Sequence, residues 1–103
     1  MEHLIKIKNL DMNLEATIPE WVVFDDEKAD LIYEWTEQNW FLFFKLKDCH
    51  EKLWHTRAGN YVLESCYEGN KPWYEVISNG YAADLVRERD RETYIKHFKP
   101  RVL

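Results

Sequence analysis

Four carboxylate side chains have the spacing that most suggests a binding function. They follow one another at intervals of three, four and three residues: Glu27, Asp30, Glu34 and Glu37. If this segment is an α-helix, they lie within about 80° of one another around its axis. Such a row would complement a basic protein, so these residues are the predicted partner-binding site. The alternative is a solvated helix face, in which the helix dipole stabilises Glu27 and Asp30.

The charge of the surrounding segment favours a basic partner as well. Residues 11–37 contain nine acidic side chains and one basic side chain, and the whole chain has a net charge of −5. Negative charge repels the phosphates of nucleic acids and attracts basic surfaces. The sequence therefore predicts a basic protein partner and no direct contact with nucleic acid.

The side chains that could bind metal or act as nucleophiles form no recognisable motif. Neither of the two cysteines, Cys49 and Cys66, belongs to the closely spaced ligand pairs of a structural zinc site. We expect His55 and Cys66 in paired strands, where they could approach one another; the alternative is a packed thiol and a surface histidine. Phosphate-binding, metalloprotease and hydrolase motifs are also missing from the sequence. We therefore expect no catalytic residue, no metal, no cofactor and no enzymatic activity.

Aromatic residues make up 16% of the chain and suggest an alternative function. Rings on an exposed sheet face can stack with the bases of single-stranded nucleic acids. The rings expected on strands are Trp40, Phe41, Phe43, Trp54, Tyr61, Tyr67, Trp73 and Tyr74. Few basic side chains accompany them, which favours packing of most of these rings in the core.

Hydrophobic patterning predicts strands and a helix in the first half of the chain. Apolar residues alternate with polar ones in residues 3–8 and 10–18, and residues 21–24 are β-branched and aromatic, so three strands are expected. A helix is expected over residues 26–38, with Leu31, Ile32 and Trp35 on its buried side. Residues 40–47 begin apolar on both faces, which predicts a central strand.

The second half of the chain is expected to form a hairpin, a strand and a long helix. The hairpin covers residues 53–66 around Gly59, and the strand covers residues 73–77. Ser78 can cap a helix over residues 79–98 whose buried stripe begins Ala82, Leu85 and Val86. Later apolar residues point to the opposite side: Tyr94, Ile95 and Phe98. Either the helix bends or breaks there, or these residues form an arm that packs on a partner or on a second subunit of a homodimer.

The expected fold is a single α+β domain spanning residues 1–103, with a mostly antiparallel sheet of five to seven strands and two helices. The residues from Trp54 to Leu63, the strand ending at Ser78 and the helix containing Ala82 resemble small ββ(β)α accessory proteins of bacterial and phage genomes. No basic segment followed by an apolar run begins the chain, and no apolar stretch approaches the length of a membrane helix. A reducing cytoplasm with free thiols, and no membrane contact, is therefore expected.

Together these features predict a small acidic protein-binding module. Inhibition of a basic nucleic-acid-handling enzyme, of the kind that phages and mobile elements encode, is the specific form of this hypothesis. The alternative is a single-stranded nucleic-acid binder that uses an aromatic sheet face.

Overall fold

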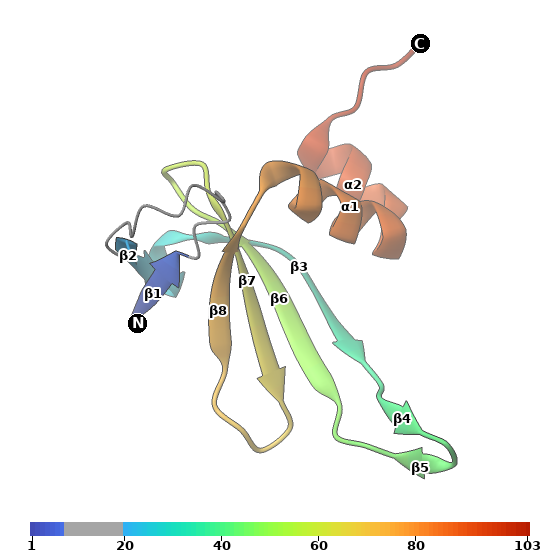
Figure 1. Ribbon diagram of the computed structural model, residues 1–103. Helices are drawn as coiled ribbons and strands as arrows, with labels where there is room; N and C mark the ends of the chain where they lie inside the picture. The colour runs from blue at the N-terminus through green and yellow to red at the C-terminus, as the bar shows by residue number, and fades with distance from the viewer. Residues whose placement is uncertain (8–19) are drawn as a thin grey trace, which may run out of the picture.

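The computed structural model describes residues 1–7 and 20–103, and the strand predicted over residues 10–18 lies outside them. The described residues form eight strands in three sheets, a short 3₁₀ helix and two α-helices (Figure 1). The elements are β1 (Glu2–Ile7), β2 (Glu20–Asp25), the 3₁₀ helix (Asp26–Lys28), β3 (Asp30–Glu37), β4 (Trp40–Phe41), β5 (Phe44–Lys45), β6 (Cys49–His55), β7 (Tyr61–Tyr67), β8 (Trp73–Ile77), α1 (Asn79–Arg89) and α2 (Arg91–Phe98). The predicted α+β class with two helices and mostly antiparallel pairing is confirmed. The single sheet of five to seven strands is wrong, because the strands are divided among three sheets.

The central sheet has four antiparallel strands in the order β3-β6-β7-β8. Its β6–β7 hairpin confirms the one predicted around Gly59, which has the positive φ of 91° that such a turn requires. The Thr56 hydroxyl accepts a hydrogen bond of 3.1 Å from the Asn60 amide and closes the turn. The order leaves β3 and β8 as the two edge strands of this sheet.

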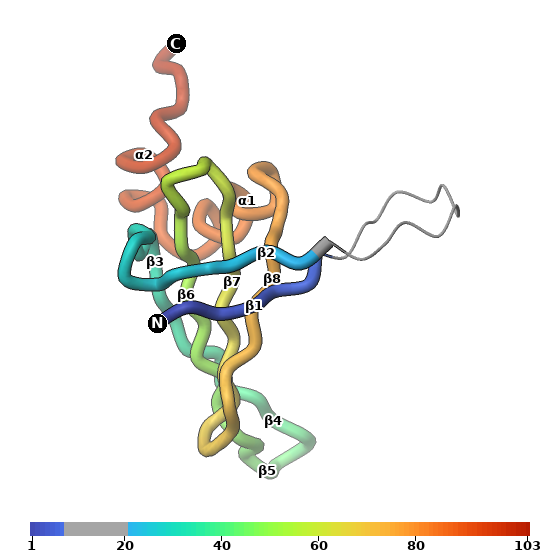
Figure 2. Tube along the Cα trace, turned by 90° about the vertical axis from the view of Figure 1, so that its left-hand side faces the viewer, coloured from blue at the N-terminus to red at the C-terminus, as the bar shows by residue number. Residues whose placement is uncertain are grey.

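Each face of the central sheet is covered by a different element. On one face, α1 and α2 pack over a buried cluster of Leu53, Tyr61, Ala82 and Val86. On the other face, the β1–β2 hairpin crosses the strands and buries Ile5 and Phe24 against Val62 (Figure 2). Alternation along β6 and β7 supplies both clusters, because neighbouring residues of a strand point to opposite faces. We call these the helix face and the hairpin face.

The predicted helix over residues 26–38 is wrong. Only Asp26–Lys28 is helical, and Asp30–Glu37 is the edge strand β3, paired with β6. The register shifts between Leu31 and Tyr33, and this bulge lets Ile32, Tyr33 and Trp35 all pack on the helix face. The bulge thus produces an apolar spacing in the sequence that resembles a helix, although β-branched and aromatic residues favour a strand.

The predicted central strand over residues 40–47 is also wrong. The segment forms a separate small hairpin, β4–β5, in which Phe41 pairs with Phe44. Leu42 occupies the left-handed region at the turn with a φ of 54°, which is uncommon for a residue with a side chain. The apolar residues on both faces of this hairpin are exposed and not buried.

The helix predicted over residues 79–98 breaks at Asp90 into α1 and α2. Ser78 caps α1 as expected, accepting a hydrogen bond of 3.1 Å from the Tyr81 amide. Asp90 has an extended backbone, and its carboxylate accepts the amides of Glu92 and Thr93, which starts α2. The break re-aims the second helix, so that Tyr94 and Phe98 pack against the same cluster as Ala82 and Val86. The first of the two alternatives for this segment is therefore the one observed.

Candidate interaction site

The most prominent surface feature is the apolar hairpin formed by residues 40–46, which we call the aromatic hairpin. It projects from the end of the central sheet farthest from the two helices (Figure 1). Its large apolar side chains are exposed, from 51% at Leu46 to 94% at Phe43: Trp40, Phe41, Leu42, Phe43, Phe44 and Leu46. Contiguous exposed apolar side chains of this number are unusual on a monomer and mark interaction surfaces.

Backbone and side-chain contacts at its base hold the aromatic hairpin in place. The Leu46 amide donates to the Asn39 carbonyl at 2.7 Å, and the Asn39 side-chain amide donates to the Lys47 carbonyl at 3.1 Å. Lys45 forms an ion pair of 3.7 Å with Asp48. The projecting side chains are therefore presented from a closed hairpin, which lowers the entropic cost of binding.

The aromatic hairpin has the composition of a protein-binding hot spot. Tryptophan and phenylalanine are enriched where interfaces bury the most surface, and burying one such side chain contributes roughly 1.5–3 kcal/mol. The sequence carries a signal for this feature: five consecutive apolar residues, from Trp40 to Phe44, without the polar alternation of a half-buried strand. The run also fits a buried strand, because an apolar run alone does not distinguish a core strand from an exposed hairpin.

The structure does not gather the four predicted partner-binding carboxylates on one face. Glu27 lies on the 3₁₀ helix, whereas the other three lie on β3. The register pairs Glu34 with Lys52 but Asp30 with His55, so these two acids point to opposite faces of the sheet. Glu37 accepts a hydrogen bond of 2.7 Å from Arg89 of α1 and is thus held in an internal ion pair. The row expected from helical spacing is therefore absent.

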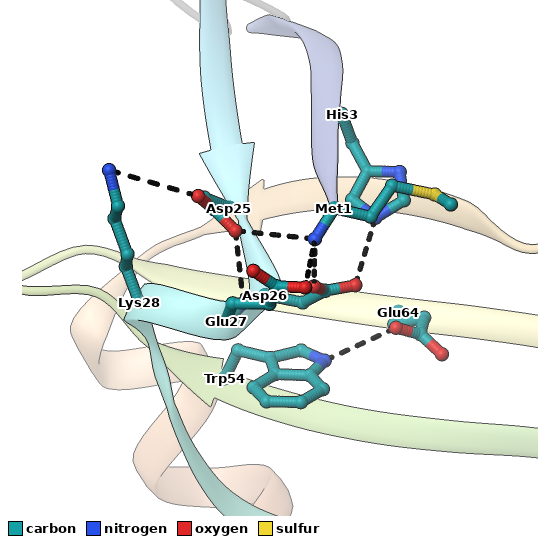
Figure 3. A network of polar contacts seen from close by, with 8 residues as sticks. All are labelled: Met1, His3, Asp25, Asp26, Glu27, Lys28, Trp54 and Glu64. Atoms are coloured by element: carbon teal, nitrogen blue, oxygen red, sulfur yellow. Dashed lines mark hydrogen bonds and ion pairs between the residues drawn. The ribbon is translucent and has the colours of Figure 1, made fainter.

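Glu27 and two neighbouring acidic residues, Asp25 and Asp26, hold the N-terminus in place (Figure 3). The Met1 ammonium lies 2.8 Å from Asp26 and 3.4 Å from both Asp25 and Glu27. Hydrogen bonding to Asp26 is the main cause that raises the pKa of this ammonium to about 10. The ammonium and His3, which lies 3.1 Å from Asp26, lower the pKa of that carboxyl group. Part of the negative charge is thus used to fix β1 beside the 3₁₀ helix.

The predicted arm is for the most part packed on its own sheet. Phe98 stacks on Tyr61 at 5.7 Å and on Tyr94 at 5.4 Å, and both Tyr94 and Phe98 lie against the helix-face cluster. Next to them, His97 shares a hydrogen bond of 2.8 Å with the Tyr61 hydroxyl. Ile95 alone of the three points outward, with 48% of its surface exposed.

The cysteines and histidines do not come together as a catalytic or metal site. The register places His55 opposite Tyr61 and places Cys66 opposite His50, so the expected approach of His55 and Cys66 does not occur. The Cys66 thiol donates to the Asn70 carbonyl at 3.1 Å, and burial raises the pKa of the Cys49 thiol. Among residues 1–7 and 20–103, no group of three potential metal ligands is found.

Three of the eight rings considered for nucleic-acid stacking lie inside packed clusters, so the expectation that most of them pack in the core is wrong. Tyr74 and Trp54 pack on the hairpin face beside Phe24, where His3 stacks on Tyr74 at 4.2 Å. The Trp54 indole also donates to Glu64 at 3.3 Å (Figure 3). Tyr61 is buried on the helix face. The other five rings of that set are exposed: Trp40, Phe41 and Phe43 in the aromatic hairpin, and the pair Tyr67 and Trp73 at the open end of the sheet.

No protein family matches the chain, and no curated protein or solved structure matches it at a significant level. Within the described part of the chain, neither α-helix is long and apolar enough to cross a membrane.

Proposed function

We propose that this protein is a protein-binding module that docks through the aromatic hairpin. The observation that carries the proposal is the exposure of six large apolar side chains on one closed hairpin. Their burial by a partner would remove from water a surface that the fold itself leaves exposed. Trp40 and Phe43 are the side chains best suited to fill pockets on the partner.

Charge favours a protein as the ligand over nucleic acid. The chain has a net charge of −5, which repels phosphate groups at a distance. Lys45, a basic side chain within the hairpin, is paired with Asp48 and contributes little free positive charge. An apolar contact surface on an acidic protein fits a partner with an apolar pocket and a basic surround.

The proposed partner is a basic protein, and inhibition of a nucleic-acid-handling enzyme is the specific form of the proposal. The exposed carboxylates around β3, such as Glu27 and Asp30, would then act by steering a basic partner toward the hairpin. They would not need to form a row, because long-range attraction depends on summed charge and not on spacing. The resemblance to phage and bacterial accessory proteins stays a prediction that accords with this role.

Capture of a partner from the native host tests the proposal. Immobilised wild-type protein is compared with F41S/F43S, which removes two exposed rings, and with I95S, a matched change at an exposed apolar position on α2. We expect wild type and I95S to retain the same specific protein and F41S/F43S to lose it. Equal capture by a folded F41S/F43S protein, or retention of nucleic acid at low salt instead of a protein, would contradict the proposal.

A further inference from the structure

A groove of about 890 Å³ runs along the edge strand β8, away from the aromatic hairpin. One wall is formed by the unbroken run of residues 72–78, which includes all of β8. The other boundary residues are Leu4, Ile5 and Lys6 of β1, and Tyr81 in the first turn of α1. A groove that follows the backbone of a strand over its whole length fits an extended chain better than a compact small molecule.

Among residues 1–7 and 20–103, none pairs with the backbone of β8 on the groove side. In the described part of the chain β8 pairs with β7 alone, and β1 crosses it by side-chain packing without joining its ladder. Alternate residues of an edge strand direct their N–H and C=O groups outward. β8 is five residues long and contains no proline, so its ladder can be extended along its length.

The middle of β8 carries an acidic side chain that lacks a counter-charge. Glu75 forms no ion pair with any residue among those described. It points to the helix face, because the register places it opposite Leu63, which pairs with Leu53 of the helix-face cluster. On the same face, burial and Glu37 raise the pKa of Glu51, with a smaller contribution from Glu75. Lys6 belongs to β1, which packs on the hairpin face, so Lys6 and Glu75 lie on opposite sides of β8. A strand added at this edge would therefore favour a basic side chain opposite Glu75.

The same charge disfavours a second copy of this chain as the added strand. In a two-fold symmetric dimer, the β8 strands of the two copies would pair antiparallel. With full overlap, the pairing is centred on residue 75, so each Glu75 would lie directly opposite the other. Like charges opposite one another destabilise a strand pair. A register shifted by two residues avoids this contact but places Pro72 or Ser78 within the ladder and shortens it.

We propose that the edge of β8 binds an extended peptide segment as a fifth strand of the central sheet, with a basic side chain opposite Glu75 and apolar side chains opposite Trp73 and Ile77. Alternate side chains of the segment would point to the hairpin face, where Leu4 and Ile5 border the groove. This site is separate from the aromatic hairpin and does not depend on the function proposed for it.

The test uses capped synthetic heptapeptides and the full chain. TIVKVIT places its lysine opposite Glu75 in either strand direction, TIVEVIT reverses that charge, and a fully N-methylated TIVKVIT removes the backbone donors. Binding is followed by NMR shifts and amide exchange. We expect TIVKVIT to perturb and protect the amides of residues 73–77, to bind about fivefold more tightly than TIVEVIT, and to lose binding on N-methylation.

Charge reversal in the protein completes the experiment. E75K should reverse the preference, so that TIVEVIT binds more tightly, whereas E88K, an equal charge change on the exposed side of α1, should keep the preference for TIVKVIT. Four results would overturn the proposal: no binding of TIVKVIT, equal binding of the two peptides, shifts confined to residues 40–46, or a free protein that is dimeric with the β8 amides already protected.

Discussion

Removal of the most exposed ring should separate folding from binding. Phe43 is 94% exposed, so F43S removes almost no contact from the folded state, and the free energy of unfolding should change by less than about 0.5 kcal/mol. By contrast, Leu53 is fully buried under the helices, and L53A should lower that free energy by roughly 2–5 kcal/mol. Both values come from urea unfolding followed by circular dichroism.

F43S should weaken partner binding strongly, although it leaves the free energy of unfolding almost unchanged. A phenylalanine that becomes buried in a partner contributes roughly 1.5–3 kcal/mol, which corresponds to a tenfold to hundredfold loss of affinity. Isothermal titration calorimetry with the captured partner measures this loss. A decrease of about 2 kcal/mol or more in the free energy of unfolding of free F43S would show that the ring is packed against the protein itself and is not available to a partner.

Three further predictions concern the fold. Trp35 packs on the helix-face cluster, and the Arg89 guanidinium lies 4.8 Å from the centre of its ring. W35A should therefore lower the free energy of unfolding by about 3 kcal/mol, and an unchanged urea midpoint would contradict this packing. Asp90 caps α2 through two amides, so D90A should cost about 1 kcal/mol and D90N much less, as measured by thermal unfolding. Because the pKa of the Met1 ammonium is raised, its contacts stabilise the fold fully below pH 8 and are lost as the pH rises through about 10. Because the pKa of Asp26 is lowered, its contribution to stability is present above about pH 4 and is lost as the pH falls further. Urea midpoints at pH 3, 7 and 10.5 should therefore be highest at pH 7, and a midpoint that rises at pH 10.5 would exclude the stabilising role of the ammonium.

Local patterns predicted the second half of the chain well. The turn at Gly59, the strand ending at Ile77 and the cap at Ser78 depend on short-range chemistry that a sequence displays directly. The break at Asp90 is marked by the change of apolar side near Tyr94, which indicates a bend or break.

In the first half, the strands predicted over residues 3–8 and 21–24 are confirmed as β1 and β2, whereas residues 26–47 resisted prediction because their pattern is set by tertiary contacts. The bulge at Ile32 shifts the alternation of β3 and imitates the spacing of a helix, and only pairing with β6 resolves the ambiguity. That one misassignment created the predicted acidic row, since Glu27, Asp30, Glu34 and Glu37 share a face on a helix and not on a strand. The exposure of the aromatic hairpin could not be predicted either, because an apolar run in the sequence is compatible with both a buried strand and an exposed one.

Docking of a protein partner on the aromatic hairpin can be tested by photo-crosslinking in the native host. A benzophenone amino acid replaces Phe43 in one protein and Ile95 in another, and cross-linked products are identified by mass spectrometry. Docking through the hairpin predicts that one dominant protein is cross-linked from position 43 and not from position 95, and that apolar residues line the attachment site on the partner. Cross-linking of that same protein from position 95 but not from position 43 would contradict it.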